Sequence, residues 1–113
     1  MKNPIMSLTT DSASLDTMLD MLSNSHRRRI LLAVSDHNPR HEDEFTLDEL
    51  DDDNGRRLKI SLRHAHLPKL ADKGYIEWDP DTQTIRRGPN FDDIAPLLRL
   101  MEEHHDELPD DWP

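Results

Sequence analysis

The chain has 113 residues and a formal net charge of −10, and its few aromatic residues leave Leu, Ile, Val, Met and Ala to form most of one modest core. It contains no cysteine, which excludes disulfides, thiolate zinc sites and cysteine nucleophiles and fits a reducing cytoplasm. No apolar run approaches the roughly 20 residues of a membrane-spanning helix, and the first residues lack the apolar segment of a secretory signal. We therefore expect a cytoplasmic protein with no membrane partner, made of one domain over residues 14–105, a flexible N-terminus at 1–13 and an acidic tail at 106–113.

Two amphipathic helices are predicted first. Leu15, Met18, Leu19 and Leu22 recur at the spacing of one helix face, with Ser12 or Ser14 as the cap. The "SNS" at 23–25 interrupts this pattern and caps a second helix, which Asn38-Pro39 ends. The inner face of the second helix is expected to hold Ile30, Leu31, Ala33 and Val34. We interpret the arginines at 27–29 as surface residues, one of which contacts acids of a neighbouring helix, with contact to a DNA backbone as the alternative.

The next segment combines a predicted loop with a strong helix signal. "RHEDE" at 40–44 is polar and acidic, which predicts a loop. Thr46 and Glu49 then form a capping box, and Phe45 and Leu50 are spaced for a hydrophobic staple, so a helix is predicted to begin at Thr46. This helix should be short, because the acids at 51–53 lie at its C-terminal end, where the helix dipole disfavours them.

A longer helix is predicted from Arg56 to Lys73, after a turn at Asn54-Gly55. Pro68 lies inside it and removes one backbone hydrogen bond at a cost of about 3 kcal/mol, so we expect a helix that bends near Pro68. Gly74 is the expected left-handed residue that ends it.

The remaining elements are a hairpin and a last helix. "YIEWDPDTQTIRRG" at 75–88 predicts two strands joined by a turn at 79–81, with Tyr75 and Trp78 packed at the core or at the base of the hairpin. The last helix is expected to be capped by Asp92 or Asp93, with Pro96 in its first turn. The tail from about residue 106 is expected to fray.

The charge is distributed unevenly along the chain. Residues 56–87 hold eight basic and four acidic side chains, a local charge of +4 that leaves −14 on the rest. Affinity for a polyanion comes largely from Lys and Arg, so a basic segment on an acidic body favours nucleic-acid binding at that segment. The alternative is an ordinary solvated helix face that pairs with nearby aspartates. An acidic surface with few lysines is also typical of halophilic proteins.

The segment "HLPKLADKGYI", with His66, Leu67, Leu70, Gly74, Tyr75 and Ile76, resembles the end of the recognition helix in ArsR-like winged-helix regulators. "LDMLSNSHRRRILLAV" resembles the opening helices of that family, and "LRHAHLPKLADKGYIEWD" is similar to small haloarchaeal winged-helix regulators. The resemblance implies a mainly α fold with a small β-hairpin, in which four helices, two strands and a final helix form a winged helix-turn-helix.

This fold implies a sequence-specific DNA-binding regulator of transcription. Its recognition helix, at about 56–73, would enter the major groove of double-stranded DNA, and its wing, at about 75–88, would contact the backbone or the minor groove. The candidate DNA-binding residues are Arg56, Arg57, Lys59, Arg63, Lys69, Lys73, Arg86 and Arg87. The alternative is a winged-helix module for protein–protein interaction with little DNA binding, because the fold serves both purposes.

Further expectations concern assembly and chemistry. We expect a homodimer, because regulators of this shape pair through terminal helices; the candidate interface residues are Leu15, Met18, Leu97, Leu100 and Met101. His104 and His105, with the acids around them, are the alternative of a metal site across a dimer, but we expect no metal, cofactor or small-molecule effector. No phosphate loop or nucleophile motif is present, so we expect no enzymatic activity.

Overall fold

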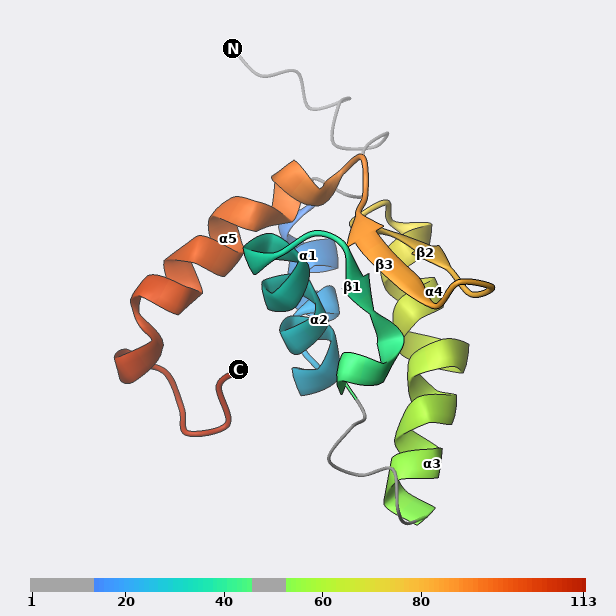
Figure 1. Cartoon of the computed structure of the whole chain (residues 1–113). Helices are drawn as coiled ribbons and strands as arrows, with labels where there is room; N and C mark the ends of the chain where they lie inside the picture. Colours follow the sequence, from blue (N-terminus) through green and yellow to red (C-terminus); the bar gives the residue numbers. More distant parts are fainter. Residues whose placement is uncertain (1–13, 46–52) are drawn as a thin grey trace.

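The computed structural model describes residues 14–45 and 53–113 (Figure 1). Its helices and strands are α1 (Leu15–Met21), α2 (Ser25–Asp36), β1 (Arg40–His41), α3 (Asp53–Ser61), α4 (Leu67–Asp72), β2 (Ile76–Asp79), β3 (Thr84–Arg87) and α5 (Phe91–Glu103). Short 3₁₀ helices cover Glu42–Phe45 and His105–Glu107, and a π-helical turn covers Leu62–His66. The predicted class, mainly helical with a small β element, is confirmed, and the arrangement is compatible with a winged helix.

The first two helices begin at the predicted caps. The Ser14 hydroxyl accepts from the amide of Thr17, and the Asn24 side chain accepts from the amide of His26 at 2.8 Å. These side chains satisfy amides that would otherwise lack a partner at each helix start. Helix α2 ends at Asp36, just before Asn38-Pro39, as the sequence predicts.

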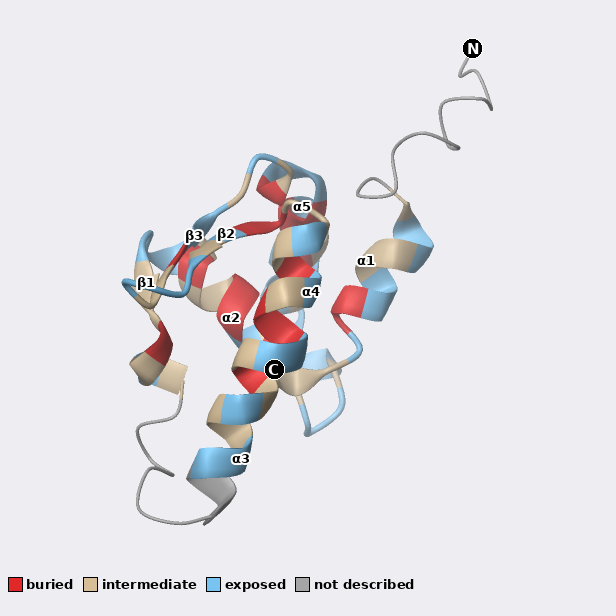
Figure 2. Cartoon of the chain, turned by 90° about the vertical axis from the view of Figure 1, so that its right-hand side faces the viewer, coloured by how far each residue is buried: buried red, intermediate tan, exposed pale blue. Residues whose placement is uncertain are grey.

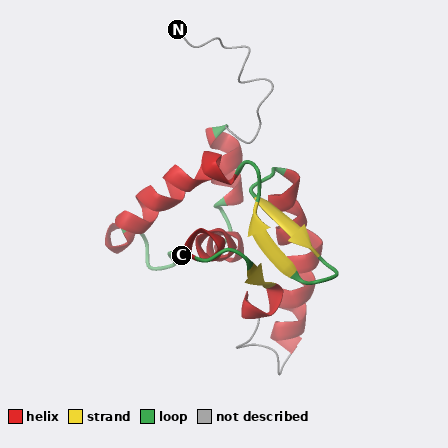
Figure 3. Ribbon diagram, turned by 45° about the horizontal axis from the view of Figure 1, so that its top comes forward, coloured by secondary structure: helices red, strands yellow, loops and turns green. Residues whose placement is uncertain are grey.

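The sheet contains a strand that the sequence did not reveal. The loop predicted at 40–44 is wrong, because Arg40 and His41 form β1, which pairs antiparallel with β3, and the following residues form a 3₁₀ helix. The strand order is therefore β1-β3-β2 (Figure 3). A two-residue strand carries no detectable alternation, and this one is held by tertiary contacts: the Arg40 guanidinium donates to the carbonyl of Ala33 and to Glu44.

Helix α3, the π-helical turn and α4 follow one another without a break and form the helical rod, residues 53–72. The turn predicted at Asn54-Gly55 is wrong, because both residues lie inside α3; a glycine in a helix costs only about 1 kcal/mol relative to alanine. The irregularity expected at Pro68 takes the form of the π-helical turn just before it, where the amide of Leu67 donates to the carbonyl of Leu62. The capping box at Thr46 and Glu49 lies outside the described residues.

The rod ends as predicted, at Gly74. This glycine has φ +77°, its amide donates to the carbonyl of Ala71, and the amide of Tyr75 donates to the carbonyl of Leu70. These two bonds make a Schellman motif, which turns the chain directly into β2. The packing predicted for Tyr75 and Trp78 is confirmed: Tyr75 is fully buried, as is Ile76 beside it, and Trp78 packs partly buried against the core. Burial raises the pKa of Tyr75 to about 12.

Helix α5 begins earlier than predicted. It starts at Phe91 after the N-cap Asn90, so Asp92 and Asp93 lie in its first turn instead of capping it, and Pro96 lies inside the helix. Tertiary contacts fix this start: Phe91 is buried, and the Asn90 side chain donates to the carbonyl of Lys73 at 3.0 Å. Pro96 is exposed, so the backbone hydrogen bond that a proline cannot donate is missing on the side of the helix that faces solvent.

Helix α2 lies at the centre of the fold, between α5 on one side and the sheet and the rod on the other (Figures 1 and 3). Its Ile30, Leu31 and Val34 are fully buried, as predicted, whereas Ala33, the fourth residue of the predicted inner face, is only half-buried. The core gathers around the three buried residues (Figure 2). Within the described ranges, no helix combines the length and the apolar character that crossing a membrane requires.

The C-terminal tail does not fray as predicted. After α5 it forms a 3₁₀ turn at His105–Glu107 and folds back across the end of α5, so that the carbonyl of Asp111 accepts from the Arg28 side chain on α2. Leu108 and Trp112 are only partly exposed as a result.

Candidate nucleic-acid interface

Helix α3 extends beyond the rest of the described fold at one end, on the same side of the molecule as the β2–β3 hairpin (Figures 1 and 2). Its spacing arranges the outward side chains in two stripes. Arg57, Ile60 and His64 share one exposed face, and Arg56, Lys59 and Arg63 run beside it toward the hairpin. The π-helical turn and α4 continue the rod, and their buried residues pack in the core.

Parts of both stripes are left available by the fold. Arg57 is exposed and Lys59 half-buried, and neither side chain forms an ion pair or hydrogen bond with any other residue of the described ranges. Ile60 is 53% exposed although its neighbours on the rod turn their apolar side chains inward. An available Arg beside an exposed apolar side chain on a projecting helix is a suitable surface for the edges of bases in a groove.

Arg63 lies where the rod meets the hairpin. Its guanidinium lies 5.6 Å over the Trp78 ring and donates to the carbonyl of Pro80 in the hairpin turn at 3.2 Å. Its Nε also lies 3.7 Å from a carboxylate oxygen of Glu42. The structure thus uses this predicted DNA-binding residue to hold the hairpin against the rod.

Glu42 is a buried acid that sequence reasoning missed. It is only 3% exposed; one carboxylate oxygen accepts from the Trp78 indole at 2.7 Å, and the other accepts no hydrogen bond from the described part of the chain. It comes from the segment "RHEDE", whose acidic composition predicts exposure. The indole N–H of Trp78, which needs an acceptor when it is packed inside, was the one available signal.

Lys69 and Lys73 lie on the part of the rod nearest the core. Lys69 forms an ion pair with Asp20 of α1 at 3.1 Å, and Lys73 is the C-cap of α4. The structure therefore directs Lys69 toward α1 rather than to the projecting end of the rod.

The two arginines of the hairpin have different surroundings. Arg87 is exposed but bonded across the surface to α2: its guanidinium donates to the carbonyls of Val34 and Ser35, both at 2.8 Å, and lies over the Phe91 ring. Cations are favoured at this position, the C-terminal end of α2. Arg86 is exposed and faces Glu77 across the strands. The hairpin therefore offers one available arginine beside an acid, less positive charge than the sequence implied.

Arg27 of α2 contacts the rod through His66. The expectation that it is a surface residue is wrong, because it is buried and donates to the carbonyls of Met21 and Asp20, each at 2.8 Å. Its remaining nitrogen contacts His66 of the π-helical turn. Burial lowers the pKa of Arg27, and the carboxylate of Asp20 partly opposes that shift.

The five predicted dimer residues separate into two groups. Leu15 on α1 and Leu100 on α5 are 59% and 54% exposed, and Leu19 on α1 joins them as an exposed leucine. Met18, Leu97 and Met101 instead pack partly against the core of their own chain. The exposed leucines are thus the part of the predicted surface that a second copy can reach.

The alternative of a metal site at the end of α5 gains no support. His104 contacts Glu107 at 2.7 Å, and His105 lies 3.0 Å from the carbonyl of Glu102. No group of three or more His, Asp or Glu side chains within residues 14–45 and 53–113 has the arrangement to hold a metal ion.

Residues 40–86 match the model of a family described as a domain of unknown function, DUF7344. The match covers less than half of the chain and runs from β1 through the rod to β3, so it contains the α3 surface, the hairpin and Glu42. No curated protein and no solved structure matches the chain. The resemblance to ArsR-like regulators therefore stays a prediction.

Proposed function

We propose that this protein is a winged helix-turn-helix regulator that binds double-stranded DNA, with α3 as the part of the recognition helix that enters the major groove. The single observation that carries the proposal is the projecting face of α3, where Arg57 and Lys59 have no partner within the described chain and Ile60 is exposed. The arrangement of helix, short strand, helical rod and hairpin is compatible with that fold.

Each side chain of this face has a chemical counterpart on duplex DNA. An α-helix about 10–12 Å in diameter fits the major groove, which is about 12 Å wide. Arg57 can donate two hydrogen bonds to a guanine edge, Ile60 can contact a thymine methyl group, and Lys59 can reach a phosphate. The acidic remainder of the chain opposes nonspecific binding.

The hairpin has a narrower role in this proposal than the sequence implied. Arg86 is its available cation and can contact one phosphate of the backbone, while Arg63 and Arg87 fix the hairpin to the rod and to α2. We therefore assign DNA contact to Arg57, Lys59 and Arg86, with Arg56 beside them, and an orienting role to Arg63, Lys69 and Arg87.

The test combines selection with a salt titration. Duplexes that the protein retains are selected from a random library, and the affinity for the selected duplex is then measured at several salt concentrations. Replacing Arg57 with Ala should weaken binding to the selected duplex by about 1–3 kcal/mol and relax its sequence preference, because a guanine contact is lost. Replacing Lys59 with Ala should lower the slope of log affinity against log salt by about 0.9, because one phosphate contact is lost.

Arg99→Ala is the matched control, because Arg99 is an exposed arginine on α5 and its removal changes the net charge equally. It should leave both the affinity and the slope close to those of the unchanged protein. If Arg99→Ala weakened binding as much as Arg57→Ala, or lowered the salt slope as much as Lys59→Ala, the result would contradict α3 as the interface. A protein that retains no duplex at any salt concentration would contradict DNA binding itself and favour the protein-interaction module.

We also propose that the protein acts as a homodimer that buries Leu15, Leu19 and Leu100. Three exposed leucines on the two terminal helices are apolar surface that a second copy can cover. Leu15→Lys and Leu100→Lys should each lower the mass in light scattering from that of a dimer toward that of a monomer. Ile60→Lys, at an equally exposed apolar residue on α3, should leave the mass unchanged.

A further inference from the structure

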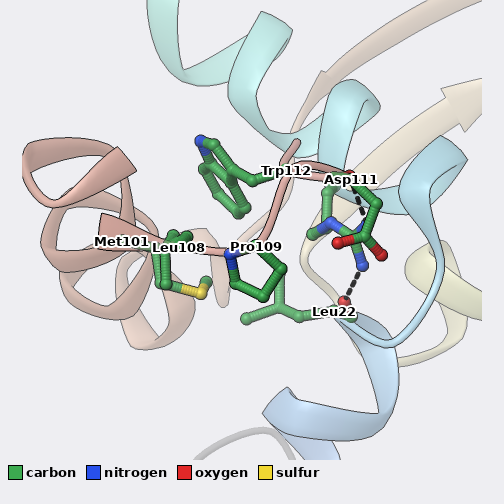
Figure 4. Close-up of a pocket in the computed structure, with 7 residues that line it drawn as sticks. Leu22, Met101, Leu108, Pro109, Asp111 and Trp112 are labelled. Atoms are coloured by element: carbon green, nitrogen blue, oxygen red, sulfur yellow. Dashed lines mark hydrogen bonds between the residues drawn. The ribbon is translucent and has the colours of Figure 1, made fainter. Parts of the chain in front are cut away.

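The folded-back tail forms one wall of an open pocket at the end of α5 (Figure 4). Its volume is about 220 Å³, and its walls come from three parts of the chain: the corner between α1 and α2, the last turns of α5, and the tail. The lining residues are Leu22, Arg28, Met101, Leu108, Pro109, Asp111 and Trp112. None of them belongs to the rod or the hairpin, so the pocket is separate from the proposed DNA-binding surface.

Arg28 is the cation of this pocket. Its guanidinium donates to the carbonyls of Leu22 at 2.7 Å and Asp111 at 3.3 Å. Its Nε is buried and has no acceptor among the residues the structure describes. No carboxylate of those residues lies within 4.0 Å of the guanidinium, although Asp111 also lines the pocket.

The guanidinium of Arg28 therefore bonds to two backbone carbonyls and, within the described residues, has no carboxylate to balance its charge. The buried Nε is out of reach of a ligand in the pocket, and Nη2, the nitrogen that donates to Asp111, makes its contact on the exposed side. A cation with no nearby anion favours binding one. The fork of N–H groups on an arginine matches the two oxygens of a carboxylate. The other walls of the pocket are apolar, apart from Asp111, and the Trp112 indole forms one of them (Figure 4).

We propose that this pocket binds a small organic carboxylate with a single apolar or aromatic ring, with the carboxylate on Arg28 and the ring against Trp112, Met101 and Leu22. The volume supports a ligand of this size, because an apolar cavity of about 150 Å³ accommodates benzene. The remaining space is sufficient for a carboxylate. Such a ligand bridges the tail, α5 and the α1–α2 corner.

Nuclear magnetic resonance of the full chain tests the proposal, with benzoate as the probe. The chain has two tryptophans, so the spectrum has two indole N–H signals, and Trp112→Phe assigns them. Benzoate, titrated at constant ionic strength to keep screening equal, should shift the Trp112 signal saturably and leave that of Trp78 in place. Benzamide and benzylamine, which keep the ring but remove or reverse the charge, should bind at least tenfold more weakly.

Substitutions separate the role of Arg28 from a general effect of charge. Arg28→Gln should weaken benzoate binding by a factor of about ten to a hundred, as expected when a charge-assisted hydrogen bond is lost. Arg29→Gln, at the exposed neighbour of Arg28, should bind benzoate as the unchanged protein does. If Arg28→Gln does not fold, Trp112→Ala near the end of the tail replaces it, with the backbone amides of Leu22 and Met101 as the reporters of weakened binding.

Three results would each overturn the proposal. They are a response to benzamide equal to that to benzoate, a preference for benzylamine, and the absence of a saturable shift at any benzoate concentration. Because no part of the measurement involves DNA, its outcome is independent of the proposed function.

Discussion

The guanidinium of Arg27 reaches from α2 to the helical rod, where its Nη1 lies 3.1 Å from Nδ1 of His66. The two residues are only 7% and 8% exposed. Because a guanidinium can only donate, Nδ1 of His66 accepts, and the imidazole is neutral with its proton on Nε2. This contact joins the centre of the fold to the π-helical turn of the proposed recognition helix.

Arg27→Met is expected to lower the free energy of unfolding by about 2–4 kcal/mol, since it leaves His66 and the carbonyls of Met21 and Asp20 without their donor. Urea unfolding monitored by circular dichroism measures the change. Arg29→Met, at an exposed arginine on the same helix, should stay within about 0.5 kcal/mol of the unchanged protein. Full stability in an Arg27→Lys variant would show that the charge, rather than the fork of donors, holds the contact.

The same contact makes stability depend on pH. Burial lowers the pKa of His66, and its neighbours Arg27, His26 and Lys69 lower it further. Above the unfolded value of about 6.5, neither state binds a proton at this site. As the pH falls below that value the unfolded chain takes up its proton first, so stability falls until the pH is below the pKa of the folded state.

His66→Asn should therefore flatten the dependence of unfolding free energy on pH below about 6.5, by at most about 1.4 kcal/mol per pH unit. Asn keeps an acceptor for Arg27 but does not titrate. The control is His64→Asn, because His64 is exposed on the same rod. If both variants retained the slope of the unchanged protein, the titration of other groups would account for it.

The buried Glu42 and the half-buried Arg63 form a second contact, which holds the hairpin beside the proposed recognition surface. Arg63→Gln removes the cation 3.7 Å from a carboxylate that is otherwise bonded only to Trp78 within the described residues, and should cost about 2–3 kcal/mol. Adding Glu42→Gln should recover part of this loss, with a coupling of about 0.5–3 kcal/mol in a double-mutant cycle measured by urea unfolding. Arg86→Gln is the control, because Arg86 is an exposed arginine of the β2–β3 hairpin. It should change the free energy of unfolding little. Strict additivity of the two substitutions would show that the carboxylate does not depend on Arg63.

Local chemistry was sufficient to predict much of this fold. The caps at Ser14 and Asn24, the glycine that ends the rod and the two hairpin strands all depend on residues adjacent in sequence. The failures were set by distant contacts. Strand β1 exists because β3 lies beside it, and α5 begins at Phe91 because that ring is buried and Asn90 bonds to Lys73.

Contacts between residues distant in sequence also limited what could be predicted about the candidate site. Charge patterning identified the basic segment, but it could not separate the arginines that bond to other elements of the fold from those left available. Arg86 and Arg87 are adjacent in sequence and both exposed, yet only Arg87 bonds to the carbonyls of α2. Alternation along a strand predicts that neighbours face opposite sides, but not which side meets a helix end.

The last prediction concerns the point where the rod, the hairpin and α5 meet. A methyl group on Gly88 would lie 2.3 Å from the carbonyl oxygen of Gly74, and one on Gly74 would lie 2.5 Å from the side-chain nitrogen of Asn90. The first obstacle is backbone, held by the amide of Asn90 at 2.8 Å, whereas the second is a side chain that can move only by giving up its bond to the carbonyl of Lys73. Gly74→Ala should cost about 2–3 kcal/mol, for its left-handed conformation and for the loss of this hydrogen bond.

Gly88→Ala should cost more than Gly74→Ala, because the entry to β2 must shift and with it the bonds that join the rod to α5. Urea unfolding of the two variants compares them directly. Gly74→Asn serves as the control for conformation, since Asn adopts the left-handed region more readily than Ala and should be the milder of the two substitutions at that position. If Gly88→Ala lost less unfolding free energy than Gly74→Ala, the backbone where the rod, the hairpin and α5 meet would be able to shift without breaking these bonds.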